Sequence, residues 1–286
     1  MPAALKTRTL VMGATGRVGA LLQRHWSMTS APVFYQSRGE GFDLKWDPLK
    51  DGPEPLMRFA KAQGGLGAIV AMIGATPSTA GDMSQTAKLA QAVIHAAEQA
   101  AVPRVLLASS AAVYPLGADM NEAVTPNPNS PYGQAKLDME QAVTQSNLEV
   151  CCLRVGNVAG ADALIGVAAK RTDKVPVKLD QFADGKGPVR SYISPRDLAA
   201  CLEALIGHTN PLPSVLNCAT TPATEMADLL GAAGLDWEWV PASPEKSQTQ
   251  WITLDCTALA QIAGGDVLAA TPYQMITDLK ELGVLQ

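Results

Sequence analysis

Short apolar runs alternate with longer amphipathic or alanine-rich stretches over the first 160 residues of the chain. The apolar runs predict strands at residues 10–12, 33–35, 68–73, 105–108 and 149–153. The stretches between them predict helices at residues 17–26, 82–100 and 131–145. The Pro- and Gly-rich residues 39–55 are expected to be mostly loop. Strands separated by helices indicate βαβ units, and continuously apolar strands indicate a parallel sheet buried on both faces.

The alternation weakens after residue 160. Here the pattern predicts a helix at residues 197–206, a strand at 215–218 and a helix at 225–233. Short elements without a repeat are expected from residue 235 onwards. We predict an α/β fold, a Rossmann doubly wound parallel sheet with a small C-terminal substrate-binding lobe. Residues 1–160 form its core, and residues 161–286 complete the sheet and form the lobe, with no independent linker.

Composition excludes several classes of protein. The 286 residues include 22 Lys and Arg and 27 Asp and Glu, a net charge of −5, which gives no support to a nucleic-acid partner. Five cysteines and three histidines are scattered without ligand spacing, so we expect buried reduced thiols and no metal site. The chain shows no signal-peptide pattern and no bilayer-length apolar run, so we expect a cytoplasmic protein without a membrane partner.

A glycine-rich turn lies between the first predicted strand and helix, at residues 13–19 (GATGRVG). Gly13 and Gly16 leave room for a pyrophosphate to approach backbone N–H groups at a helix start, and Gly19 allows close helix packing. A tight turn without a ligand is the alternative interpretation. The surrounding strand–turn–helix pattern favours a dinucleotide cofactor, bound by a site that includes Thr15, Arg17 and Val18 as well.

The end of the second predicted strand carries no acidic residue to bind a ribose 2′-hydroxyl. Arg38 follows this strand, and a guanidinium group pairs well with a 2′-phosphate. Arg17 could reach the same phosphate. The sequence therefore favours NADP, with NAD possible, although both arginines could also be solvated surface residues.

A candidate catalytic group comes from Ser110, Tyr132 and Lys136. Ser110 follows the fourth predicted strand, and the carboxyl ends of parallel strands are where such sheets bind ligands. Tyr132 and Lys136 are four residues apart and share one face of a helix that Ser130 and Pro131 should start. A nearby ammonium group lowers the pKa of a phenol, so this group can transfer a proton while the serine holds a substrate oxygen.

These motifs together resemble those of an extended short-chain dehydrogenase/reductase of the NAD-dependent epimerase/dehydratase family, over most of the chain. Residues 13–19 resemble its nucleotide turn, and residues 109–114 (SSAAVY) its serine segment. Tyr132 and Lys136 match its catalytic pair. Residues 153–160 (LRVGNVAG) and 190–199 (RSYISPRDLA) resemble two further family segments, and residues 73–75 stand where the family passes backbone along the cofactor.

The resemblance implies roles for these residues and an NAD(P)-dependent oxidoreductase that acts on a C–OH/C=O centre. Its small-molecule substrate would be a nucleotide sugar or a related carbonyl compound. The cofactor site would include Tyr132 and Lys136, and further Ile73, Gly74, Ala75 and Val155. The substrate site would include Ser110, Asn157 and Arg190. A nucleotide-sugar epimerase with bound NAD and a non-catalytic NAD(P)-sensing protein are alternatives. Family dimers suggest a possible homodimer through the helices at residues 82–100 and 131–145.

Some positions depart from the family pattern. Pro115, Ser191 and Ser194 replace its usual Gly, Asp and His. Family dehydratases carry an acidic pair directly after the catalytic serine or threonine, whereas this chain has Ala111 and Ala112 there. We therefore expect a reductase or an epimerase and no 4,6-dehydratase.

Overall fold

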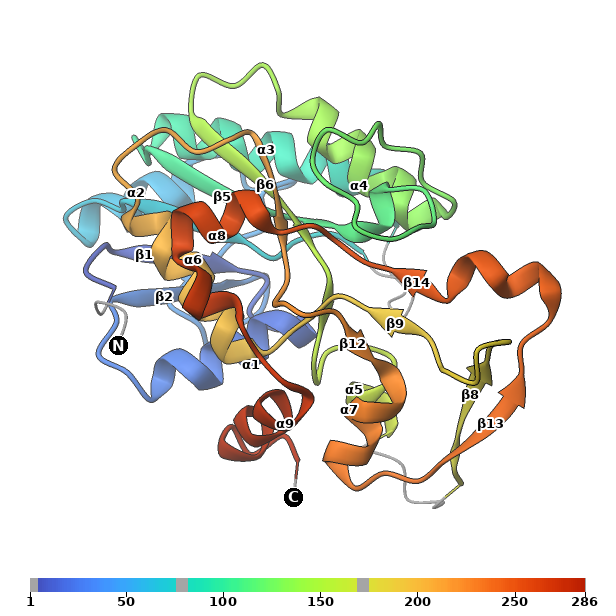
Figure 1. Cartoon of the computed structure of the whole chain (residues 1–286). Coiled ribbons are helices and arrows are strands. Elements are labelled where there is room, and N and C mark those ends of the chain that lie inside the picture. Colours follow the sequence, from blue (N-terminus) through green and yellow to red (C-terminus); the bar gives the residue numbers. More distant parts are fainter. Residues whose placement is uncertain (1–4, 76–81, 169–174, 286) are drawn as a thin grey trace. The chain divides into compact units, whose positions relative to one another are not determined.

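The computed structural model of the chain describes residues 5–75, 82–168 and 175–285. Its central feature is a seven-stranded sheet with the strand order β11-β6-β5-β4-β1-β2-β3 (Figure 1). The neighbouring strands β1 and β2, β1 and β4, β2 and β3, and β4 and β5 run parallel to each other. The strands are β1 Thr9–Met12, β2 Val33–Ser37, β3 Leu44–Lys45, β4 Ala68–Ala71, β5 Arg104–Ser110, β6 Glu149–Val155 and β11 Val215–Cys218. The predicted Rossmann-type α/β fold is confirmed.

The chain forms two compact units whose segments interleave along the sequence. The first unit contains residues 1–115, 125–154 and 202–216, and therefore most of the sheet. The second contains residues 116–124, 155–201 and 217–286. Each unit is described by itself below.

Helices cover both faces of the sheet in the first unit. They are α1 Arg17–Ser27, α2 Glu54–Ala62, α3 Thr86–Gln99 and α4 Pro131–Ala142. Side chains of α2, α3 and α4 form one apolar core with the strands, in which Leu56, Val93 and Met139 pack with Ile69 and Leu107. On α1, the indole N–H of Trp26 donates to Glu203 at 2.7 Å, near the end of helix α6 (Pro195–Gly207).

The second unit is built from short elements. Its strands form the small sheets β10-β7, β12-β9-β14 and β13-β8. Leu229 and Leu230 of α7 pack with Met275 and Leu279 of α9 in its apolar core. The elements are β7 Asn157–Val158, α5 Ile165–Ala168, β8 Val177–Gln181, β9 Val189–Arg190, β10 Tyr192–Ile193, β12 Thr224–Glu225, α7 Met226–Ala233, β13 Trp237–Pro241, β14 Trp251–Ile252, α8 Thr257–Ala263 and α9 Pro272–Glu281.

Several predicted boundaries were wrong. The strand predicted at residues 68–73 ends at Ala71, because the chain turns towards Gly74, which has φ +108°. The region predicted as loop contains β3 and leads into α2, a helix that the sequence did not predict. Helix α2 has nine residues, with Pro53 at its N-cap, so its apolar repeat is short and looks like part of the loop.

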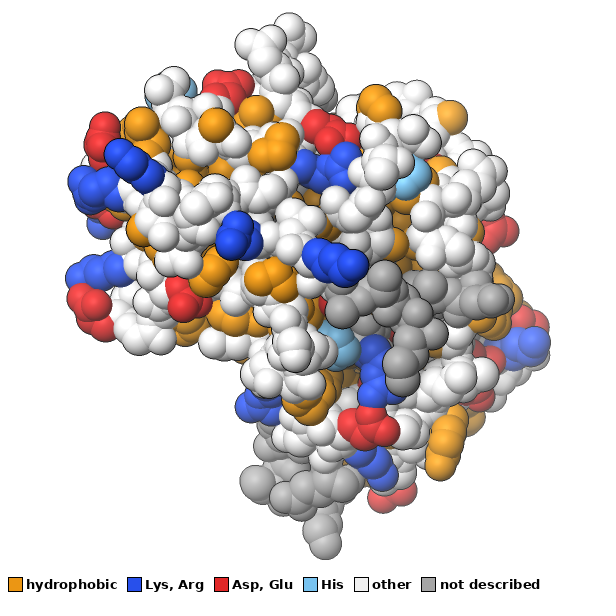
Figure 2. Space-filling model, turned by 90° about the vertical axis from the view of Figure 1, so that its left-hand side faces the viewer, with side chains coloured by type: hydrophobic (Ala, Val, Ile, Leu, Met, Phe, Trp, Pro, Cys, Tyr) orange, Lys and Arg blue, Asp and Glu red, His pale blue; other side chains and the backbone are white. Residues whose placement is uncertain are grey.

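Surface charges are mixed in sign. On the face drawn in Figure 2, Lys and Arg side chains are interspersed with Asp and Glu side chains and form no continuous basic stripe. Within the described residues, no helix combines the length and the apolar character needed to cross a membrane.

Candidate functional site

The glycine turn connects β1 to α1, as predicted. Gly13 has φ +76°, and a Cβ atom on it would lie 2.3 Å from the carbonyl oxygen of Met72. A Cβ atom on Gly19 would lie 2.3 Å from the carbonyl oxygen of Gly13. The turn and the start of the helix therefore pack too closely for side chains at these two positions.

The start of α1 suits an anionic group. Gly16 is its N-cap residue, and no side chain caps the helix there. The N–H groups of the first helical turn carry partial positive charge and commonly bind phosphates. Thr15 and Gly16 are exposed beside this turn, and Val18 is half-buried. The residues present therefore fit a dinucleotide pyrophosphate.

Gln36 is a buried part of this site that the sequence did not predict. Its Oε1 accepts the N–H of Gly13 at 3.1 Å, and its Nε2 donates to the carbonyl oxygen of Trp46 at 2.5 Å. Gln36 thus links the glycine turn to the chain after β3. No local sequence pattern indicates this role, because the partners are distant along the chain.

The two arginines proposed to select the cofactor lie on the surface of the first unit. Arg38 directly follows β2 and is exposed, as is Arg17 at the start of α1. Ser37 ends β2, and its hydroxyl accepts the N–H of Gly39 at 3.0 Å. The carboxyl end of β2 thus carries a hydroxyl and a guanidinium group and no carboxylate.

Ser110 and Tyr132 come together as the sequence predicted. Ser110 ends β5, and its hydroxyl accepts the N–H of Ala112 at 3.2 Å. Tyr132 lies in the first turn of α4, which starts at Ser130, whose hydroxyl accepts the N–H of Gly133 at 3.1 Å. Ser110 lies close enough to Tyr132 for its hydroxyl to act on the ionisation of the phenol. A serine hydroxyl and a phenol therefore share one position at the carboxyl end of the sheet.

Lys136 lies one helical turn further along α4 and is only 4% exposed. Its ammonium group donates to the carbonyl oxygens of Ile73, at 3.0 Å, and Ala108, at 2.6 Å. A Cβ atom on Gly74 would lie 3.3 Å from the same nitrogen. The segment from Ile73 to Ala75, predicted to follow the cofactor, thus borders Lys136. Residues 76–81 lie outside the described residues. The helix predicted from residue 82 starts later, because residues 83–85 form a 3₁₀ turn and α3 begins at Thr86.

Burial dominates the ionisation of both groups. It raises the pKa of Tyr132 above its ordinary value, and the Ser110 hydroxyl opposes this only partly. The sequence-based expectation of a lowered phenol pKa is therefore not met in the chain alone, because desolvation disfavours the phenolate. Burial likewise lowers the pKa of Lys136 to about 8, against opposing effects of Cys152 and Glu140.

Of the predicted substrate residues, Asn157 and Arg190 belong to the second unit, as does Val155, which is 9% exposed, whereas Ser110 belongs to the first unit. Asn157 begins β7 and pairs with Tyr192, and its backbone N–H donates to the Ser191 carbonyl oxygen at 2.9 Å. The guanidinium group of Arg190 donates to the carbonyl oxygens of Val189, at 2.7 Å, and Gln250, at 3.0 Å.

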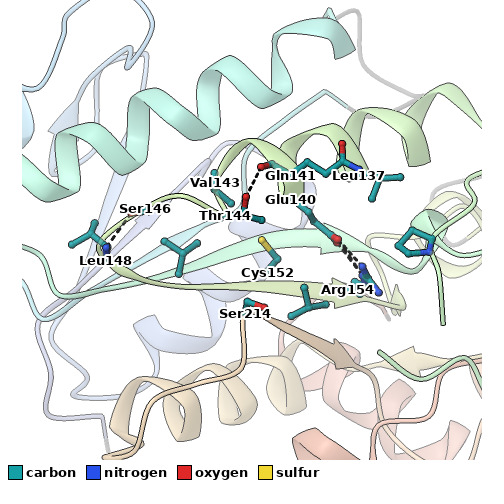
Figure 3. A pocket seen from close by; sticks show the side chains of 13 residues that line it. Leu137, Glu140, Gln141, Val143, Thr144, Ser146, Leu148, Cys152, Arg154 and Ser214 are labelled. Carbon is teal, nitrogen blue, oxygen red and sulfur yellow. Dashed lines mark hydrogen bonds and ion pairs between the residues drawn. The ribbon is translucent and has the colours of Figure 1, made fainter. Parts of the chain in front are cut away.

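A buried ion pair also lies beside the candidate catalytic group. Glu140 and Arg154 approach to 2.7 Å, with side chains 6% and 5% exposed (Figure 3). Ser109 donates to Glu140 at 2.5 Å. The spacing of Tyr132, Lys136 and Glu140, four residues each, was a signal for it that the sequence interpretation did not use.

The ion pair borders one end of a groove of about 390 Å³ on the outer side of α4. Apolar side chains of β6 and of the segment after α4, among them Val150, Val143 and Leu148, form much of its lining (Figure 3). Ser110, Tyr132 and Lys136 are not among the residues that line it. The groove is therefore separate from the candidate catalytic group.

The cysteines are free and buried, as predicted. They are Cys151, Cys152, Cys201, Cys218 and Cys256. The described part of the chain brings together no three His, Cys, Asp or Glu side chains that could hold a metal ion.

Comparison with known families agrees with this geometry. The model of the NAD-dependent epimerase/dehydratase family matches residues 9–219, well over half of the chain. The chain therefore belongs to this family of enzymes. The matched region spans the glycine turn, Ser110, Tyr132 and Lys136. A search of curated proteins found no match.

Solved structures share the fold. The Bordetella bronchiseptica enzyme WbmG in complex with NAD and UDP has a TM-score of 0.76 and 18% identity, over 98% of this chain and 96% of that chain. A short-chain dehydrogenase/reductase superfamily protein from Agrobacterium tumefaciens with bound NAD has a TM-score of 0.72 and 18% identity, over 96% of both chains. A UDP-glucose 4-epimerase from Thermotoga maritima with UDP-glucose has a TM-score of 0.72 and 17% identity, over 95% and 97%.

Proposed function

We propose that this protein is an NAD(P)-dependent oxidoreductase that acts on a C–OH/C=O centre through Ser110, Tyr132 and Lys136. The observation that carries the proposal is that Ser110 at the end of β5 lies beside Tyr132 in the first turn of α4, with Lys136 one helical turn away. A nicotinamide cofactor supplies hydride transfer when bound. The turn at residues 13–19, with the uncapped start of α1, would hold its pyrophosphate.

The side chains divide the remaining work. Ser110 would donate a hydrogen bond to the substrate oxygen, and Tyr132 would give a proton to that oxygen or take one from it. Lys136 has three N–H donors, and Ile73 and Ala108 accept two of them, which leaves one for a ligand. A bound cofactor ribose is the ligand that the family resemblance implies. A positive charge at Lys136 also favours the phenolate form of Tyr132, against the effect of burial.

NADP is the cofactor that we propose. Arg38 is exposed directly after β2, where a 2′-phosphate would be neutralised, and Ser37 replaces the acidic residue that would repel it. The similar structures from Bordetella and Agrobacterium contain NAD, and their identity to this chain is 18%. Arg38 is thus the residue on which the preference depends.

A nucleotide-sugar epimerase is the second candidate. Similar folds include UDP-glucose 4-epimerases from Thermotoga maritima and Thermus thermophilus. An epimerase removes and returns hydride on one bound cofactor, so it should retain NAD through purification. A reductase exchanges its cofactor in each turnover.

Cofactor binding and turnover test the proposal together. Fluorescence titration should show tighter binding of NADPH than of NADH, and Arg38→Ala should remove this difference, whereas Arg58→Ala, on α2, should keep it. The purified protein should oxidise added NADPH with members of a panel of ketones and nucleotide-linked keto sugars. Mass spectrometry that finds stoichiometric retained NAD would favour the epimerase. No binding of either cofactor at millimolar concentration would refute both candidates.

A further inference from the structure

Glu140 extends the stripe of functional side chains on α4. It follows Lys136 by four residues, as Lys136 follows Tyr132, so all three lie along one face of the helix. Lys136 and Glu140 are 4% and 5% exposed. A carboxylate is therefore buried one turn beyond the candidate catalytic ammonium group.

The carboxylate holds the ends of two strands. Its Oε1 accepts the hydroxyl of Ser109, and its two oxygens accept N–H groups of Arg154, with Nη2 at 2.7 Å from Oε2 (Figure 3). Ser109 directly precedes Ser110 in β5, and Arg154 is the penultimate residue of β6. Glu140 thus connects α4 to β5 and β6 beside the candidate site.

The turn after Ser110 is also fixed by contacts, with Arg154 and with the start of α4. The guanidinium carbon of Arg154 lies 4.6 Å from the centre of the Tyr114 ring, which is 3% exposed. A Cβ atom on Gly133 would lie 2.1 Å from the carbonyl oxygen of Ala112, so this turn packs directly on the start of α4. A shift of α4 against β5 would change the Ser110–Tyr132 contact.

Glu140 also bears on the charge of Lys136. The ammonium group faces four other parts of the first unit: the Cys152 thiol of β6, the Thr86 hydroxyl of α3 near Gly74, the Ala108 carbonyl oxygen of β5, and the Ile73 carbonyl oxygen after β4. Burial raises the pKa of Cys152 to about 12, so the thiol is neutral where Lys136 titrates. Among the groups that raise the pKa of Lys136, Glu140 is therefore the carboxyl group.

Stability alone does not explain this arrangement. A buried ion pair often contributes no more to stability than well-packed apolar residues of similar volume, because both charges lose their hydration. The pair of Glu140 and Arg154 contacts residues that neighbour Ser110 and Lys136. This placement favours a role in the reaction.

We propose that Glu140 is a positioning residue: through Ser109 and Arg154 it fixes β5 and β6 against α4, and its negative charge keeps Lys136 protonated. The inference rests on the proposed function of Ser110, Tyr132 and Lys136. Glu140 itself touches neither substrate nor cofactor in this scheme. It acts through the groups that do.

Glu140→Gln is the main test, because it removes the charge and keeps the shape of the side chain. We expect the alkaline limb of the pH profile of kcat, measured in the reducing direction, to move down by about one pH unit. At pH 8, kcat should fall roughly fivefold, with KM changed less than about twofold. The matched control is Glu149→Gln, at the other end of β6, which should leave the profile in place. An unshifted profile in Glu140→Gln would overturn the proposal.

NMR of ¹³C-labelled lysine provides a readout that needs neither substrate nor cofactor. The Lys136 signal, assigned with Lys136→Arg, should titrate at a lower pH in Glu140→Gln than in the wild type. An unchanged midpoint overturns the proposed charge effect. If the wild-type protein shows no turnover, the proposed function fails while this measurement still decides what Glu140 does to Lys136.

Ser109→Ala tests the positioning role if Glu140→Gln does not fold. This variant removes one hydrogen bond and leaves the ion pair in place. We expect kcat to fall about threefold at every pH, without a shift of the profile, since one hydrogen bond to the Glu140 carboxylate is lost while its charge and its pairing with Arg154 remain. Wild-type kcat at all pH values would overturn the positioning role.

Discussion

One ion pair lies at the amino ends of strands β5 and β6 and another at their carboxyl ends, and the two pairs differ in burial and in the groups that they contact. At the amino ends, Arg104 and Glu149 approach to 2.6 Å, with side chains 11% and 26% exposed. At the carboxyl ends, Glu140 and Arg154 are more deeply buried. The amino-end pair contacts only backbone groups besides itself, whereas the carboxyl-end pair contacts the segments that carry Ser110 and Lys136.

The amino-end pair closes the fold of the first unit. The guanidinium group of Arg104 donates to the carbonyl oxygens of Leu205, at 2.6 Å, Ile206, at 3.0 Å, and His208, at 2.8 Å. Glu149 accepts the N–H of Leu212 at 2.7 Å. Carbonyl groups at a helix end lack intrahelical partners, so Arg104 satisfies those at the end of α6. The comparison teaches that the same chemistry serves stability at one end of a parallel sheet and the site at the other.

Tyr132→Phe should have the largest effect on activity. Because the phenol hydroxyl is the proposed proton carrier, kcat should fall by about 10²- to 10⁴-fold while cofactor binding survives. The measurement is steady-state kinetics beside a fluorescence titration of NADPH. Wild-type turnover in this variant would mean that the groups at the carboxyl end of β5 do not carry the reaction. The two ends of the strands would then not differ in function.

Arg104→Met should have the largest effect on stability. It leaves the partly buried Glu149 carboxylate and three carbonyl groups without their partner, so unfolding free energy should fall by about 3 kcal/mol. Urea denaturation measures this, and kcat of the folded protein should stay unchanged. A fall in kcat with unchanged stability would mean that the two ends do not divide their roles.

The pH dependence of stability should show the cost of burying Lys136. Its pKa is lowered to about 8, so as pH falls from 10.5 the unfolded chain takes up this proton before the folded chain does. The wild type therefore loses stability over this window, by about 3 kcal/mol in all, and Lys136→Met does not. Urea denaturation from pH 7.5 to 10 should show that the unfolding free energy of the variant rises relative to that of the wild type as pH falls. A constant difference would contradict the lowered pKa.

Glu149→Gln should have a smaller effect on stability, and this effect should depend on pH in the acidic range. Burial alone would raise the pKa of Glu149, but hydrogen bonds from Arg104 and from the Leu212 N–H outweigh this and lower it. The carboxylate therefore stabilises the fold above pH 4.5, and this stability is lost as pH falls through the lowered pKa. At pH 7 the variant should lose about 1 kcal/mol. The loss should diminish as pH falls below 4.5 and through the lowered pKa, as thermal unfolding would show.

The smallest expected signal is the absence of a 4,6-dehydratase product. Dehydration needs an acid and a base besides hydride transfer, and the positions after Ser110 are Ala111 and Ala112, which form a short 3₁₀ turn with Val113. Incubation with nucleotide-diphosphate hexoses should yield no 4-keto-6-deoxy product. Catalytic accumulation of this product would mean that other residues supply the acid and the base.

Local signals explain what could be predicted from the sequence. The glycine turn, the cap of Ser130 and the placement of Ser110 at a strand end each depend on neighbours within a few residues. Helix α2 was missed because Pro53 and Pro55 at its start resemble loop residues. The capping box of Thr271 and Gln274 at the start of α9 was a usable local signal that the sequence interpretation did not take up.

By itself, the sequence determined the alternation of strands and helices over the first 160 residues, except for β3 and α2. It also determined the glycine turn and the placement of Ser110 at a strand end and of Tyr132 and Lys136 on one helix face, because periodicity, caps and turn residues act over short distances. Only the tertiary structure decided that Gln36 binds the turn and that Glu140 meets Ser109 and Arg154. It also decided the pKa directions of Tyr132 and Lys136. The physical reason is that burial and buried pairing depend on which distant segments pack together, and desolvation then outweighs the local chemistry of each side chain.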